Sequence, residues 1–244
     1  MKIRLDKLLL ERGLAPTRER AQAMVLAGRV LVDEQKVDKP GAAVSEDAAL
    51  RLLGDDPRYV GRGGLKLEAA LKEWKIDLAD RFCVDVGAST GGFTDCLLQH
   101  HAAHVLAIDT GYGQIAQTLR SDARVSLMER TNARHLQPGD LPVGISFLAM
   151  DVSFISATLV LRPVVQAAGH SLHEAVVLVK PQFEAGREYI GKGGIVRDPA
   201  GHELAIDRVR ECIMGLGGRD LAVIDSPILG MEGNREFLLH TRFG

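Results

Sequence analysis

The feature that most constrains this chain is an alternation of short apolar runs with helical runs after residue 81. Seven runs have the length and composition of buried strands, and they occupy residues 82–86, 104–108, 125–128, 145–150, 175–179, 221–224 and 237–239. Strands that alternate with helices build an open, mostly parallel sheet with helices on both faces. We therefore expect an α/β fold around a seven-stranded, doubly wound, Rossmann-like sheet.

The N-terminal residues follow a different pattern. Leu5, Leu8 and Leu9 mark one face of a short helix that Gly13 can end, and Thr17 can cap a second helix. Short strands are expected at 30–32 and 48–53, next to turns at 33–35 and 40–41. These elements predict a small α+β domain over residues 1–54.

The boundary between the two patterns lies where helix and strand breakers gather. Residues 55–57 are Asp-Asp-Pro, and residues 61–64 contain three glycines. We therefore expect a linker at 55–64 and a second domain at 65–244. Residues 184–201, rich in glycine and charge, form the one long loop expected inside that domain, and long loops in compact domains are usually functional.

Charge is spread unevenly along the chain. The formal net charge is −2, yet the first 31 residues hold seven lysines and arginines against three acidic residues. A basic face on a small domain suits the phosphates of a nucleic acid, although solvated helices also carry arginine. The long loop adds Arg187, Lys192 and Arg197, so it is either a lid over RNA or a solvated loop.

Membrane, exported and metal-binding classes find little support in the sequence. The longest apolar stretches are too short to cross a bilayer, and the N-terminus has no signal-peptide core, so we expect a soluble, cytoplasmic protein. The three cysteines are widely spaced and suit a core better than a disulfide framework. His100, His101 and His104 lie where a helix should end, so we expect no metal site.

A glycine-rich turn follows the first strand of the predicted sheet and indicates a nucleoside cofactor. Phe93 stands where a phosphate-binding loop needs lysine, and Ser89 where a dinucleotide fingerprint needs glycine. Asp109 ends the second strand 22 residues after Gly87 and can accept hydrogen bonds from both hydroxyls of a ribose. This pairing favours S-adenosylmethionine over a plain tight turn. The candidate cofactor contacts are Asp85, Gly87, Ala88, Ser89, Thr90, Gly91, Gly92, Phe93, Asp109, Asp151 and, at the adenine edge, Asn132.

Three ionisable residues are expected at one edge of the sheet. Asp151 ends the fourth strand and Lys180 the fifth, and ligands bind outside the carboxyl ends of parallel strands. Glu236 joins them if the last strand runs antiparallel. The cluster is either a reacting centre or a structural ion-pair network.

With these motifs the chain resembles the TlyA family, also labelled haemolysin A-like, whose second domain is similar to FtsJ ribose 2′-O-methyltransferases. The resemblance covers essentially the whole chain and rests on the segments 4–9, 62–67, 85–95, 151–156, 180–187 and 193–198. It implies a Lys-Asp-Lys-Glu tetrad at Lys66, Asp151, Lys180 and Glu236, with S-adenosylmethionine as the methyl donor. The N-terminal domain resembles the αL-type RNA-binding module.

The resemblance further implies that the target is a cytidine ribose in ribosomal RNA. Because the chain ends at Gly244, soon after the last strand, it looks like the shorter family form, for which large-subunit 23S RNA is expected, with small-subunit 16S RNA as a second candidate. The RNA contacts that we expect are Arg4, Lys7, Arg18, Arg20, Arg62, Arg187 and Arg197.

The sequence leaves two catalytic roles open for Lys180. Asp151 and Glu236 favour its charged form and Lys66 disfavours it, so Lys180 is either the general base for the ribose hydroxyl or the cation that stabilises the developing alkoxide. Asp151 would orient it, and Lys66 and Glu236 would position the ribose. The alternatives are a haemolysin-like cytolytic protein, a methyltransferase of proteins or small molecules, and an RNA-binding protein with an inactive second domain.

Overall fold

The computed structural model describes residues 2–26, 28–53, 58–230 and 233–244. The chain divides into two compact units, Met1–Asp56 and Pro57–Gly244, and each is described here by itself. Of the linker expected at 55–64, residues 55–57 lie outside the described part of the chain, as does residue 54 of the predicted first domain. Gly63 and Gly64, which the sequence places in the linker, belong to the first helix of the second unit.

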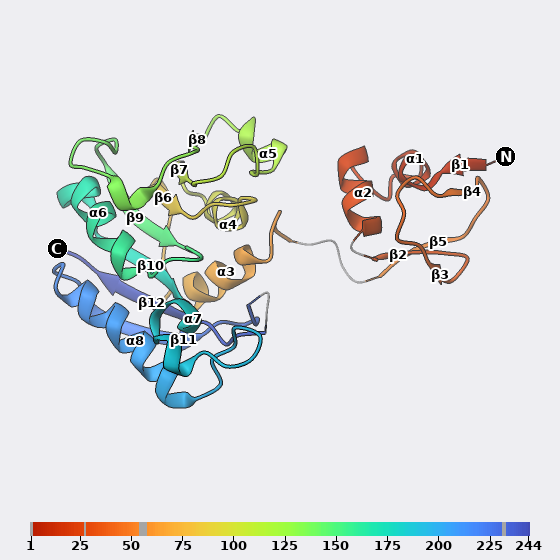
Figure 1. The fold of residues 1–244 in the computed structure, drawn as a ribbon. Coiled ribbons are helices and arrows are strands. Elements are labelled where there is room, and N and C mark those ends of the chain that lie inside the picture. Colours follow the sequence, from red (N-terminus) through yellow and green to blue (C-terminus); the bar gives the residue numbers. More distant parts are fainter. Residues whose placement is uncertain (1, 27, 54–57, 231–232) are drawn as a thin grey trace. The chain divides into compact units, whose positions relative to one another are not determined.

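The first unit is a small α+β fold (Figure 1). Its elements are β1 (Lys2–Arg4), α1 (Leu5–Glu11), α2 (Arg18–Leu26), β2 (Val30–Val32), β3 (Gln35–Lys36), β4 (Ala43–Ser45) and β5 (Leu50–Leu52). The hydroxyl of Thr17 accepts a hydrogen bond from the backbone N–H of Arg20 at 3.2 Å, as expected of a residue that caps α2. The core is built from Leu5, Leu8 and Leu9 of α1 packed with apolar side chains of α2 and β2.

The second unit alternates strands and helices over its whole length. Its elements are α3 (Gly63–Glu73), β6 (Phe82–Val86), α4 (Gly92–Gln99), β7 (His104–Ile108), α5 (Gln117–Arg120), β8 (Val125–Met128), η1 (Ala133–His135), β9 (Ile145–Met150), α6 (Thr158–Ala168), η2 (Gly169–Ser171), β10 (Glu174–Val179), α7 (Pro181–Glu184), η3 (Arg187–Tyr189), α8 (Pro199–Met214), β11 (Arg219–Asp225) and β12 (Phe237–Arg242). All seven predicted strands are present, four of them with the predicted bounds.

The seven strands form one mixed sheet in the order β11-β12-β10-β9-β6-β7-β8. The strands from β6 to β10 are mutually parallel, whereas β12 runs antiparallel to both β10 and β11. From β6 the chain first builds outward through β7 and β8, and then returns to place β9 on the other side of β6. The carboxyl ends of β6 and β9 therefore flank the topological switch point, where open α/β sheets bind their ligands.

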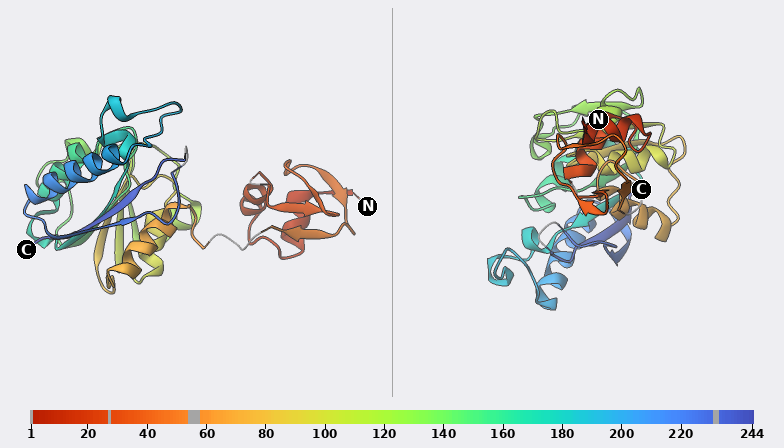
Figure 2. Two further views of the ribbon diagram at one scale, coloured as in Figure 1. Left: turned by 90° about the horizontal axis from the view of Figure 1, so that it is seen from below. Right: turned by 90° about the vertical axis from the view of Figure 1, so that its right-hand side faces the viewer.

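Helices cover both faces of this sheet, as Figures 1 and 2 show. Side chains from α3, α4 and α5 pack on one face with Cys83, Phe147 and Leu178. Side chains from α6 and α8 pack on the other with Val84, Leu148 and Val177. Because successive strand residues face opposite sides, the central strands are buried on both faces and read as continuous apolar runs in the sequence.

Candidate active site

The glycine turn after β6 is shaped by the close approach of β9. Gly87 has φ +89°, and a Cβ there would lie 2.2 Å from the backbone oxygen of Asp151. Gly91 has φ +97°, and a Cβ there would lie 2.3 Å from a methyl carbon of Leu119. Side chains at these two positions would be both strained and blocked, so only glycine lets the turn fold tightly against its neighbours.

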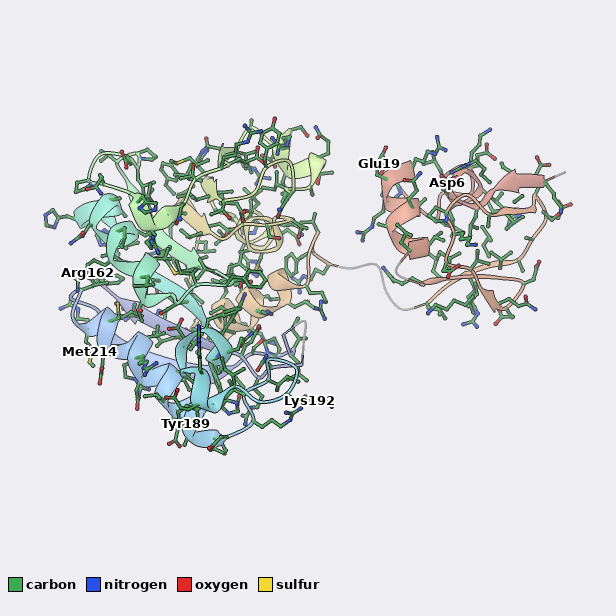
Figure 3. The ribbon with its side chains drawn as sticks, in the orientation of Figure 1. Asp6, Glu19, Arg162, Tyr189, Lys192 and Met214 are labelled. Carbon is green, nitrogen blue, oxygen red and sulfur yellow. The ribbon has the colours of Figure 1, made fainter. Side chains whose placement is uncertain are left out.

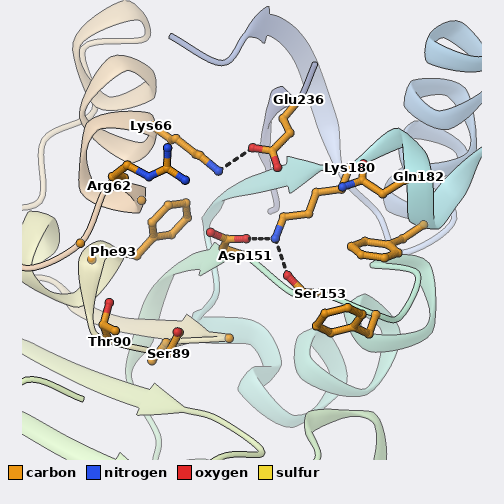
Figure 4. Close-up of a pocket in the computed structure, with 17 residues that line it drawn as sticks. Arg62, Lys66, Ser89, Thr90, Phe93, Asp151, Ser153, Lys180, Gln182 and Glu236 are labelled. Carbon is orange, nitrogen blue, oxygen red and sulfur yellow. Dashed lines mark hydrogen bonds and ion pairs between the residues drawn. The ribbon is translucent and has the colours of Figure 1, made fainter. Parts of the chain in front are cut away.

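Two lysine–carboxylate pairs lie beside this turn (Figure 4). Lys180, at the end of β10, forms an ion pair with Asp151, at the end of β9, with 2.5 Å between Nζ and Oδ1. Lys66 of α3 donates a hydrogen bond to Glu236, which precedes β12, at 2.5 Å. Asp151 and Lys180 follow the carboxyl ends of β9 and β10, and Glu236 precedes the start of the antiparallel β12, so these three residues lie at one edge of the sheet, as the sequence predicted. The fourth residue, Lys66, comes from α3.

A pocket of about 510 Å³ contains both pairs and part of the glycine turn. It is lined by Gly61, Arg62, Gly63, Lys66, Gly87, Ala88, Ser89, Thr90, Gly92, Phe93, Asp151, Ser153, Phe154, Lys180, Gln182, Phe183 and Glu236. The volume suits a small-molecule site, and the lining combines apolar rings with a few convergent charges. The four residues of the predicted tetrad thus share one cavity with six of the predicted cofactor contacts of the turn.

Four of the expected cofactor contacts do not line this pocket: Asp85, Gly91, Asp109 and Asn132. Asp85 is inaccessible beneath the turn, where its Oδ2 accepts a hydrogen bond from the Thr94 hydroxyl at 2.6 Å. Burial raises the pKa of Asp85 to about 7. Its side chain therefore supports the turn from below rather than facing a ligand.

Asp109 and Asn132 follow β7 and β8 at the same edge of the sheet, outside the pocket. Both oxygens of Asp109 accept backbone N–H groups, from Ser89 at 2.7 Å and from Gly111 at 2.6 Å. These bonds fix the carboxylate next to the glycine turn and leave lone pairs for further donors. The exposed Asn132 accepts a bond from the backbone of Arg134 at 3.1 Å and so caps η1.

The structure adds pocket residues to which the sequence assigned no role. Lys180 donates a hydrogen bond to the hydroxyl of Ser153 at 2.6 Å (Figure 4). Phe154 is 92% exposed, has φ +64°, and its ring lies 5.7 Å from that of Phe183. Ser153 and Phe154 lie in the segment 151–156 on which the family resemblance rests, shortly after a predicted strand, but neither signal assigns them a role.

Glu184 ties together, outside the pocket, the segments that follow Asp151 and Lys180. Its buried carboxylate accepts hydrogen bonds from the Ser156 hydroxyl at 2.5 Å and from the Ala157 backbone at 2.6 Å, at the start of α6. Burial raises the pKa of this carboxyl. The turn after Asp151 and the helix after Lys180 are thereby held as one frame.

The segment expected as a long loop, residues 184–201, is partly ordered by short elements. It contains η3 and a bridge between Ile190 and Val196, and α8 begins at Pro199. The backbone N–H of Val196 donates to buried Asn234 at 2.9 Å, and its carbonyl pairs with Nε2 of buried His202 at 2.9 Å. Arg187, Lys192 and Arg197 stay exposed on this frame, and Lys192 is labelled in Figure 3.

In the first unit two of the basic residues, Arg4 and Arg18, surround one buried carboxylate. Asp6 is inaccessible and receives hydrogen bonds from Arg4 at 2.8 and 3.0 Å, from Arg18 at 3.2 Å and from Gln22 at 2.9 Å (Figure 3 labels Asp6). The side chains of Arg4 and Arg18 are still about half exposed, at 51% and 52%. Lys7 is exposed and pairs with Glu11, and Arg20 lies half-buried on α2.

Among the described residues no three histidine, cysteine or acidic side chains gather as metal ligands would. No helix in this part of the chain has the length and hydropathy needed to cross a bilayer. Cys83, Cys96 and Cys212 are free thiols. His100 ends α4 as its C-terminal cap, as the sequence predicted.

Two family models match this chain, one for each unit. A model described as FtsJ-like methyltransferase matches residues 59–243. A model described as S4 domain matches residues 3–50.

Curated relatives and a solved structure match nearly the whole chain. "Putative rRNA methyltransferase YqxC" of Bacillus subtilis is 49% identical over 98% of this chain and 85% of its own length. "16S/23S rRNA (cytidine-2′-O)-methyltransferase TlyA" of Mycobacterium tuberculosis is 43% identical over 98% of this chain and 89% of its own. The solved structure of a "Putative hemolysin from Streptococcus thermophilus" is 43% identical, covers 99% of this chain and 88% of its own, and has a TM-score of 0.74.

Proposed function

This chain belongs to the TlyA family of FtsJ-like methyltransferases with an S4 domain, and we propose that it methylates the 2′-hydroxyl of a cytidine in ribosomal RNA with S-adenosylmethionine as the donor. The observation that carries the proposal is the arrangement of Lys66–Glu236 and Lys180–Asp151 in one pocket beside the glycine turn. A ribose hydroxyl placed between these pairs would meet both a cation and carboxylates.

The residues at the switch point fit an adenosine-containing methyl donor. Gly87 and Gly91 let the turn fold tightly against Asp151 and Leu119, and Asp109 is fixed beside the turn with lone pairs left for ribose hydroxyls. Phe93 adds an apolar wall to the pocket, and Asn132 is proposed for the adenine edge. When bound, the donor supplies an electrophilic methyl group on a sulfonium.

The chain's own contribution is positioning and the management of one proton. Lys180 is the group proposed to face the attacking oxygen, where it either accepts the hydroxyl proton at Nζ or stabilises the negative charge that develops. Asp151 holds the amine at the end of β9, and the Lys66–Glu236 pair lines the same pocket. Holding the oxygen in line with the methyl carbon is itself a large part of such catalysis.

The mouth of the pocket supports a nucleotide rather than a small metabolite as the acceptor. Proteins that recognise unpaired RNA splay out its bases and stack them on aromatic side chains. Phe154 is almost fully exposed at the pocket, next to Phe183, and so offers such a surface.

RNA affinity is proposed to come from the arginines and lysines of both units. Arg4, Lys7, Arg18 and Arg20 lie on the first unit, Arg62 lines the pocket, and Arg187 and Arg197 stand on the segment after α7. Contacts of this kind bind phosphates and supply affinity without reading sequence. The cytoplasmic location expected from the sequence stays a prediction.

A lytic function, which the name of the Streptococcus relative suggests for that protein, would leave the four residues of the tetrad without a role. An inactive second domain would also leave them unexplained. Both alternatives are separated from the proposal by one experiment.

The test is methyl transfer to ribosomal RNA by the full chain, with methylated riboses mapped by mass spectrometry on RNA of both subunits. Lys180→Ala should lower transfer to a small residual rate, measurable only at high enzyme concentration, while calorimetry shows S-adenosylmethionine bound as in the wild type. The matched control is Lys72→Ala, an exposed lysine on α3, which should behave as the wild type. Near-normal transfer by Lys180→Ala, or no binding of the donor by the wild type, would overturn the proposal.

A further inference from the structure

We propose that Ser153 is a positioning residue for Lys180 and sets the direction in which the amine addresses the ribose oxygen. The inference rests on the proposed function and goes beyond it, because neither the tetrad nor the cofactor turn includes Ser153. The carrying observation is the 2.6 Å hydrogen bond from Lys180 Nζ to Ser153 Oγ, inside the pocket that holds the tetrad (Figure 4).

The two partners of Lys180 constrain it differently. The contact with Asp151 is an ion pair, and Coulombic attraction depends on distance far more than on direction. The contact with Ser153 is a hydrogen bond, which requires one N–H of the amine to point at the oxygen. Asp151 therefore holds the charge in place, whereas Ser153 fixes the rotation of the amine about its carbon–nitrogen bond.

Tetrahedral geometry at Nζ turns this bond into an orientation of the whole group. One position is the carbon and a second points to Ser153, while Asp151 attracts the charge as an ion pair without a directed hydrogen bond. The bond to Ser153 thereby fixes the direction of the other two positions, and one of them is left for the substrate. If Lys180 is charged, that position is an N–H that donates to the developing alkoxide. If it is neutral, that position is the lone pair that accepts the hydroxyl proton. Ser153 acts in both cases.

The turn that carries Ser153 is built to keep its hydroxyl in place. Phe154 follows it with φ +64°, a conformation that L-residues adopt only when their surroundings enforce it. Beyond the turn, Ser156 and Ala157 are bonded to Glu184, four residues after Lys180. The Ser153–Lys180 bond is thus the inner of two links between the same two segments, and the outer link lies outside the pocket.

Ser153 is also the exposed member of the pair, because Lys180 is only 9% exposed and the serine is open to solvent. The charged groups that line the same pocket are Arg62, Lys66, Asp151 and Glu236. None of them changes when the serine hydroxyl is removed, so a change in the pH dependence of the rate would report on Lys180.

The experiment compares Ser153→Ala with Ser153→Thr, which keeps the hydroxyl, and with Ser121→Ala, an exposed serine outside the pocket. Methyl transfer to ribosomal RNA by the alanine variant should have a kcat about 10- to 100-fold lower, with the KM for RNA and donor binding changed less than about twofold. Its pH–rate profile should move to lower pH, because the charged amine has lost an acceptor. Ser153→Thr should recover much of the rate, and Ser121→Ala should match the wild type.

A double-mutant cycle separates positioning from a general loss of order. In a Lys180→Met background, Ser153→Ala should lower the residual rate no further, because it acts through the lysine. Wild-type kcat and pH profile in Ser153→Ala, or effects that multiply in the double variant, would overturn the inference. Such a result leaves the proposed function standing, because that proposal is tested by methyl transfer and donor binding in the wild type and by the Lys180→Ala variant.

Discussion

Lys66 donates a hydrogen bond to Glu236 across 2.5 Å, and so joins the first helix of the second unit to the residue that precedes its last strand. The two side chains are only 10% and 3% exposed. A buried pair of this kind repays its desolvation poorly, so it contributes little net stability even though breaking it is costly. Its retention beside the pocket is better explained by a role at the site.

This difference between stability and function can be measured. Glu236→Ala should lower the free energy of unfolding by about 3–5 kcal/mol, because it leaves the Lys66 ammonium buried without a partner. The double variant Lys66→Met/Glu236→Leu should regain most of that stability in urea denaturation and yet remain inactive in methyl transfer.

An active double variant would show that the pair serves only the fold. Equal stability of Glu236→Ala and the wild type would show instead that the ammonium finds solvent when its partner is removed.

The sequence predicted the placement of three pocket residues because strand order can be inferred from topology rules. Asp151 and Lys180 end neighbouring parallel strands, and Glu236 precedes the antiparallel one, so their convergence required only the correct sheet. Lys66 lies on α3, whose packing on the sheet no periodicity specifies, and it was assigned by resemblance alone. The prediction that Asp109 and Asn132 bind the cofactor stays a prediction.

Other features depend on geometry that a pattern of apolar residues does not encode. The strands β1 and β4 are three residues long and pair across the first unit, so they carry too few residues for an alternation to appear. Ser153 meets Lys180 through a turn in which Phe154 has a positive φ, and such a conformation is not expected of phenylalanine. No sequence pattern predicts the role of Glu184, because the groups that it binds lie at the start of α6, far from it along the chain.

Asp85 gives a prediction for the pH dependence of stability. Burial raises its pKa to about 7, against about 4 in an unfolded chain. Between these values the unfolded state has lost the proton and the folded state keeps it, so the contribution of Asp85 to stability is greatest below pH 4, falls between about pH 4 and 7, and is constant above that.

Asp85→Asn should remove this dependence. The difference in unfolding free energy between Asp85→Asn and the wild type should shift in favour of the variant from pH 4 to pH 7, by on the order of a few kcal/mol, and then stay constant. Urea denaturation at several pH values measures it. Parallel curves for the two proteins would show that Asp85 titrates at its ordinary pKa in the folded chain.

For Asp6, in the first unit, the expected pH dependence of stability has the opposite sign. Hydrogen bonds from Arg4 hold the pKa of this carboxyl well below its usual range, despite its burial. Its stabilising effect is therefore present above pH 4, the ordinary value being about 4, and is lost as the pH falls. Asp6→Ala should destabilise the first unit by about 1.5–3 kcal/mol at pH 7, the usual worth of hydrogen bonds to a charged group.

The same change should weaken RNA binding, because Arg4 and Arg18 lose the carboxylate that orients them. Fluorescence anisotropy at two salt concentrations measures the affinity, and Glu19→Ala, an exposed acid on the same unit, serves as the control. Tighter binding by Asp6→Ala would show that removing the negative charge outweighs the lost orientation of the arginines.

Phe154 combines a strained backbone with a proposed contact to the nucleobase. Two substitutions distinguish these two effects. Both Phe154→Ala and Phe154→Gly remove a ring that is 92% exposed, so little burial is lost in either. The left-handed φ of +64° costs an L-residue about 1–2 kcal/mol that glycine does not incur, so the glycine variant should be the more stable by about 1 kcal/mol in urea denaturation.

Methyl transfer should fall about tenfold in both variants, mainly through the KM for RNA, because a stacked base is worth about 1–3 kcal/mol. Equal stability of the two variants would deny the strain, and full activity of either would deny the stacking. A ring that is strained and exposed contributes little to the stability of the fold, and these two measurements decide whether it binds a base of the RNA instead.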